Sequence, residues 1–199
     1  MEINKDKKIV KNEITFPKPN FLNDEKEEKV TAARRGTLVH LCLQKLNEKQ
    51  EYDIKKIQNL IEKLEEKKII TKKEAKAINV GKILEFTHSK IWEDLKEAKE
   101  VQKEKPFYIN ISASEIYNEK TDQNILVQGI IDLYYIDKDD KLILVDYKTD
   151  YIESGCEYIL KQRYNKQIEL YSQALEQALD KKVDKRYIYS VCLNKEIEM

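Results

Sequence analysis

The first half of the chain carries apolar residues at helical spacing. In three segments an apolar side chain recurs every three or four positions, with charged residues in between. This period gathers the apolar side chains on one face of an α-helix and leaves the charges in solvent. The segments that show it are residues 38–46, 54–64 and 83–95.

These segments predict a helical part over residues 23–105, with Asn23 or Asp24 as the N-cap of its first helix. Residues 1–22 lack the pattern and are expected to form an extended or partly ordered lead-in.

The pattern changes at Pro106, where β-branched and aromatic residues become frequent. Four segments read as strands, and one long segment with helical spacing lies before the last of them. The strands are expected at residues 106–114, 124–136, 141–148 and 186–193, and the helix at residues 157–179. This β-β-β-α-β order over residues 106–199 predicts an α/β fold with a mixed sheet flanked by helices. We expect it to form one structural domain with the helical part.

The second and third strands form a predicted hairpin whose turn centres on Asp139. With that turn, Tyr134 faces Leu144, and Asp132 faces Asp146. Side chains alternate along a strand, so Asp132, Asp146 and Lys148 are expected on one face.

Two acids inside apolar strands require an explanation. Opposed side chains lie roughly 5 Å apart at Cβ. At an effective dielectric near 20, two carboxylates at that distance repel by about 3 kcal/mol. A divalent cation bound by both Asp132 and Asp146 offsets this repulsion, because Mg²⁺ and Mn²⁺ prefer oxygen ligands. The alternative is a salt-bridged cluster in which both acids share Lys148.

Composition narrows the partners only a little. The 199 residues contain 37 basic and 37 acidic side chains, so the chain is not a simple polybasic arm, although a local basic groove for DNA remains compatible. The three cysteines are scattered and are expected to be reduced and buried. There is no membrane-spanning run and no signal-peptide pattern at the N-terminus, so a cytoplasmic location is expected.

Four short motifs occur in a characteristic order: GTLVH, GIID, VDYKTD and QIELY. Together they resemble the RecB-like branch of the PD-(D/E)XK nuclease superfamily, which implies a restriction-endonuclease-like fold. The surrounding segments, such as ARRGTLVHLCLQ, KEKPFYI and YNKQIELYSQALE, narrow this resemblance over residues 28–199. They are similar to the nuclease domain of the AddA subunits of bacterial AddAB helicase-nucleases.

The resemblance assigns roles to particular residues. It implies that His40, Asp132, Asp146 and the Tyr147 carbonyl bind metal, and that Asp132, Asp146, Lys148, Gln167 and Tyr171 are catalytic. His40 is otherwise a core histidine, and Gln167 with Tyr171 is otherwise a polar patch at the sheet edge. His88 has no motif around it and is expected to be structural.

The expected function is a divalent-metal-dependent DNA nuclease, using Mg²⁺ or Mn²⁺, with Mn²⁺ at least as effective because histidine suits it better. Its substrate would be single-stranded DNA or a duplex end. The chain contains no Walker A motif. The resemblance therefore implies helicase domains elsewhere in a parent chain, with AddB as partner, in an enzyme that resects double-strand breaks.

Candidate phosphate contacts are Arg34, Arg35, Lys161, Arg163 and Lys166. A non-catalytic DNA-binding module and a structural scaffold are the alternative functions.

Overall fold

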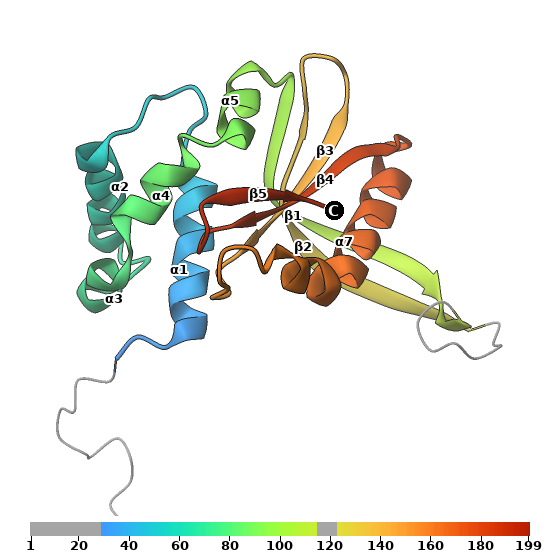
Figure 1. Cartoon of the computed structure of the whole chain (residues 1–199), viewed down its shortest axis with the longest axis horizontal. Coiled ribbons are helices and arrows are strands. Elements are labelled where there is room, and N and C mark those ends of the chain that lie inside the picture. Colours follow the sequence, from blue (N-terminus) through green and yellow to red (C-terminus); the bar gives the residue numbers. More distant parts are fainter. Residues whose placement is uncertain (1–28, 115–122) are drawn as a thin grey trace, which may run out of the picture.

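The computed structural model describes residues 29–114 and 123–199, in which helices cover both faces of one sheet (Figure 1). The expected lead-in at residues 1–22 and the expected N-cap at Asn23 or Asp24 lie outside the described residues.

Helices α1 to α5 cover one face of the sheet. They are α1 (Ala32–Lys45), α2 (Ile54–Glu66), α3 (Lys72–Ala77), α4 (Val80–Phe86) and α5 (Lys90–Glu97). Each begins after a polar N-cap whose side chain accepts a hydrogen bond from the backbone three residues on; the caps are Thr31, Asp53, Thr71, Asn79 and Ser89.

The third predicted helix is two helices in the structure, α4 and α5. The break falls at Thr87–Ser89, where the Thr87 hydroxyl donates to the Leu84 carbonyl and Ser89 accepts from the Trp92 amide. Hydroxyl side chains that bond to nearby backbone compete with helix continuation. Apolar spacing persisted across this break, so the pattern alone did not reveal it.

The sheet has the order β1-β2-β3-β4-β5 in the described residues. Its strands are β1 (Glu100–Ser112), β2 (Asn124–Ile136), β3 (Leu142–Lys148), β4 (Val183–Ser190) and β5 (Lys195–Glu198). Only β3 and β4 are parallel, and helix α7 (Glu157–Leu179) connects them. The expected mixed sheet with flanking helices is therefore confirmed.

Two details of the sheet differ from expectation. Strand β1 begins at Glu100, so it includes residues on both sides of the boundary expected at Pro106. The sheet also contains β5, a short antiparallel neighbour of β4 that the sequence pattern did not reveal. Four residues are too few for a clear alternation signal.

Each face of the sheet has its own apolar core. The core on the α1–α5 side includes Trp92, Leu133 and Tyr147, and the core on the α7 side includes Ile131 and Leu160. The two helical layers are thereby fixed to the same sheet, as Figure 1 shows for α1 (blue) and α7 (orange). Among the described residues, no helix combines the length and apolarity that crossing a membrane requires.

Candidate metal centre and catalytic lysine

The centre of the site is the point where β2 leaves β3. The predicted hairpin register is confirmed, since Tyr134 pairs with Leu144. The ladder ends at Leu133 and Val145, however, and does not include a pair between Asp132 and Asp146. The Tyr147 amide instead donates to the Asp132 carboxylate over 2.8 Å.

Regular alternation also fails at Asp132. Ile131 belongs to the core on the α7 side, whereas Leu133 belongs to the core on the α1–α5 side. In a regular strand these two side chains would share a face. The expectation that Asp132, Asp146 and Lys148 share one face of a regular hairpin is therefore not met, because the strand changes face at the acid itself.

Glu104 explains much of this irregularity and was not singled out from the sequence. Strand β1 pairs Lys103 with Leu133 and Lys105 with Ile131, so Glu104 lies opposite Asp132 without pairing to it. Its φ of 51° is in the left-handed region, which is uncommon for a residue other than glycine. Such backbone strain concentrates at functional sites.

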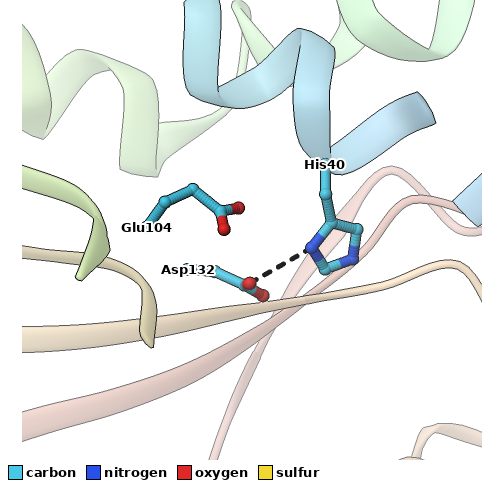
Figure 2. Close-up of side chains that lie close together, drawn as sticks. All are labelled: His40, Glu104 and Asp132. Atoms are coloured by element: carbon cyan, nitrogen blue, oxygen red, sulfur yellow. Dashed lines mark hydrogen bonds and ion pairs between the residues drawn. The ribbon is translucent and has the colours of Figure 1, made fainter. Parts of the chain in front are cut away.

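His40 reaches Asp132 from helix α1. Its Nδ1 lies 3.1 Å from Asp132 Oδ1, and its ring contacts the edge of the Tyr147 ring at a centroid distance of 5.8 Å. Gly36, one helical turn earlier, allows this approach, because an added Cβ would lie 2.9 Å from Thr149 Oγ1. Figure 2 shows His40 and Glu104 approaching Asp132 from two sides.

One ligand atom from each of His40, Glu104 and Asp132 lies within 4.8 Å of the others. Burial lowers the pKa of His40, but the hydrogen bond to Asp132 and the nearby acids outweigh it and raise this pKa. Burial and then the charge of Asp132 raise the pKa of Glu104. These shifts mark a concentration of negative charge that a cation would relieve.

Asp146 lies beside this group and is 2% exposed. Burial raises its pKa to about 6, against the opposing effect of Lys148. The Lys148 ammonium forms an ion pair with Asp146 Oδ2 at 2.6 Å, yet no described residue donates a well-directed hydrogen bond to this oxygen. A buried carboxylate oxygen in that condition is a suitable metal ligand.

Helix α7 supplies the remaining predicted residues. Gln167 Oε1 accepts a hydrogen bond from the Lys148 ammonium at 2.8 Å, and Gln167 Nε2 donates to the Tyr171 hydroxyl at 2.7 Å. The Tyr171 ring contacts Phe107 of β1. Gln167 and Tyr171 thus form a chain that begins at Lys148. The metal-binding role of the Tyr147 carbonyl stays a prediction.

Most predicted phosphate contacts already have partners in the protein. Arg34 pairs with Glu74, Arg163 with Asp150, and Lys166 with Glu169, while Arg35 donates to a backbone carbonyl. Lys161 is exposed on α7. Binding of DNA phosphates by the paired side chains would therefore require partner exchange.

Comparison with known proteins gives a consistent result. Residues 17–197 match the PD-(D/E)XK nuclease superfamily. The chain is 41% identical over 175 residues to the AddA subunit of the ATP-dependent helicase/nuclease from Thermoanaerobacter sp. (strain X514), covering 86% of this chain and 14% of that protein. It is 36% identical over 187 residues to the protein of the same name from Clostridium novyi (strain NT), covering 92% and 15%. The chain thus spans about one-seventh of these relatives.

Proposed function

This chain belongs to the PD-(D/E)XK nuclease superfamily, and we propose that it cleaves DNA phosphodiester bonds in a reaction that requires a divalent cation. The observation that carries this proposal is the meeting of an imidazole and two carboxylates opposite a buried acid–lysine pair. The ligands would be His40, Glu104, Asp132 and Asp146, with the Tyr147 carbonyl as a further candidate.

The donor set fits Mg²⁺ or Mn²⁺. Carboxylate oxygens suit both ions, whereas an imidazole nitrogen is comfortable for Mn²⁺ and unusual for Mg²⁺. The salt-bridge alternative accounts for Asp146 and Lys148, but it leaves Glu104 beside Asp132 without a cationic side chain other than His40 among the residues that meet there.

When bound, the cation would polarise the scissile phosphate and lower the pKa of a bound water. The protein's own residues act on this arrangement. Lys148 orients the attacking water and stabilises negative charge that develops on the phosphate oxygens. Gln167 holds the Lys148 ammonium in place, and Tyr171 holds Gln167.

The relatives' names suggest the setting. We infer that this nuclease works with the ATP-dependent helicase domains of a longer chain and with AddB as its partner, in the cytoplasm. In that setting it would resect double-strand breaks for recombination. A non-catalytic DNA-binding module is the alternative, and the presence of His40, Asp132, Asp146 and Lys148 together favours catalysis.

The test measures cleavage of a labelled single-stranded oligonucleotide and of a duplex end, with Mn²⁺, Mg²⁺ or a chelator. We expect activity with Mn²⁺ at least equal to that with Mg²⁺, and none with the chelator. Asp146→Ala should reduce cleavage by more than about 100-fold, because it removes a metal ligand.

The matched control is Asp139→Ala, in the exposed turn between β2 and β3, which should cleave like the wild type. DNA affinity of Asp146→Ala, measured by fluorescence anisotropy, should remain. Binding without cleavage by the wild type would support the non-catalytic module, and wild-type cleavage by Asp146→Ala would contradict the assignment of Asp146.

A further inference from the structure

The Lys148 ammonium has a third neighbour, which has no part in the proposed reaction. Its Nζ lies 4.1 Å from the centroid of the Tyr164 ring, in addition to its contacts with Asp146 and Gln167. The lysine side chain is only 13% exposed. At this distance the negative face of an aromatic ring attracts a cation, and the attraction strengthens as water is excluded.

We propose that Tyr164 is a positioning residue that holds Lys148 in its reactive place through the face of its ring. This inference rests on the proposed function, because Lys148 must act in the reaction for its position to matter. It concerns a residue outside the four motifs that suggested the nuclease.

The ring itself is held in place by a second set of contacts. The Tyr164 hydroxyl donates to Asp150 Oδ2 at 2.8 Å, and Asp150 Oδ1 accepts from Arg163 Nη1 at 2.6 Å. Asp150 follows Lys148 closely in the chain just beyond β3, so these bonds fix the first half of α7 to the end of that strand.

Spacing on α7 gives Tyr164 the same orientation as the residues that already contact the lysine. Tyr164 lies one helical turn before Gln167, and Tyr171 lies one turn after it, so the three side chains share one face of the helix. The face therefore presents a ring, an amide and a hydroxyl toward the end of β3.

An aromatic ring suits this task for a chemical reason. Lysine has a flexible stem and three N–H donors. A ring face attracts the charge without a lone pair that would engage an N–H in a strong hydrogen bond. The ammonium is thus restrained while one N–H remains able to reach a water or a phosphate oxygen.

The experiment compares Tyr164→Phe, which keeps the ring, with Tyr164→Leu, which removes it. In steady-state cleavage of an oligonucleotide with Mn²⁺, Tyr164→Leu should lower kcat about 10-fold with KM within about 2-fold. Tyr164→Phe should keep kcat near the wild-type value. The matched control is Tyr158→Leu on the same helix, where the tyrosine is 58% exposed.

A second measurement does not depend on activity. The ring current of Tyr164 should shift the Lys148 ε-methylene protons upfield in the NMR spectrum. That shift should persist in Tyr164→Phe and disappear in Tyr164→Leu. Thermal unfolding of each variant establishes that it is folded.

Three results would overturn the proposal. The first is an unchanged Lys148 resonance in Tyr164→Leu. The second is equal impairment of the Phe and Leu variants, and the third is a loss of kcat no greater than that of Tyr158→Leu. An inactive wild type would remove the proposed function and the positioning role together, while the resonance would still report whether the ring contacts Lys148.

Discussion

Glu104 shows how a single residue changes the chemistry of the site. It adds a third carboxylate near Asp132 and Asp146, and it is half-buried. Without a cation, burial and the Asp132 charge raise its pKa. With a cation bound, the same proximity becomes favourable, because ligand charge increases affinity for a divalent ion.

We therefore predict that Glu104→Gln weakens Mn²⁺ binding by roughly 10-fold or more, through the loss of one anionic ligand. Isothermal titration calorimetry and the Mn²⁺ dependence of cleavage would both measure this change. Glu100→Gln, at an exposed position of the same strand, is the matched control and should bind Mn²⁺ normally. Equal affinity in both variants would exclude Glu104 from the ligand set.

At the scale of elements, the site depends on how closely β1 and β2 approach each other. Gly129 pairs with Phe107, and a Cβ at Gly129 would lie 2.6 Å from the Phe107 ring. The ring in turn contacts Tyr171 on α7. The absence of a side chain at Gly129 thus allows the β1–β2 ribbon and α7 to pack together.

Gly129→Ala should therefore displace the Phe107 ring and destabilise the protein by about 1–3 kcal/mol, as overpacking does. Chemical denaturation would measure the loss. Cleavage should fall as well, because the displaced ring contacts Tyr171, which holds Gln167.

The double variant Gly129→Ala with Phe107→Leu provides the matched test. The smaller leucine should relieve the overlap, so the two substitutions together should cost less than the sum of their separate costs. Additive losses would show that the Gly129–Phe107 contact is not the cause.

At the scale of the whole molecule, the site joins the two helical layers across the sheet. His40 comes from α1 on one face, and Gln167 and Tyr171 come from α7 on the other. A cation bound at the end of β2 would therefore link both layers to the sheet. Anything that binds the folded state alone stabilises it.

We predict that Mn²⁺ at about 100 times its dissociation constant stabilises the chain by about 2.7 kcal/mol. For a domain of this size that corresponds to a rise in Tm of roughly 5–10 °C. Differential scanning calorimetry with and without Mn²⁺ would measure it, and Asp132→Asn should lose most of the gain. A salt-bridge cluster without a metal predicts no gain in either protein.

The shared cores also bear on how the chain is divided. Apolar side chains from α1, α4 and α5 pack with those of β2, β3 and β4. This arrangement supports our expectation that the helical part and the nuclease core form one domain, which stays a prediction.

The sequence by itself determined the local features of this protein. The hairpin register follows from a short turn and from alternation, both of which act over a few residues. The identities of His40, Asp132, Asp146 and Lys148 were also evident, because charged residues in apolar segments are costly unless they have a partner.

Only the tertiary structure decided which groups meet. Glu104 lies opposite Asp132 because β1 and β2 pair across a long connection, and no local period encodes that pairing. The ring of Tyr164 lies over Lys148 because α7 packs on the sheet in one particular orientation. Local spacing fixes the face on which a side chain lies, whereas long-range packing fixes what that face contacts.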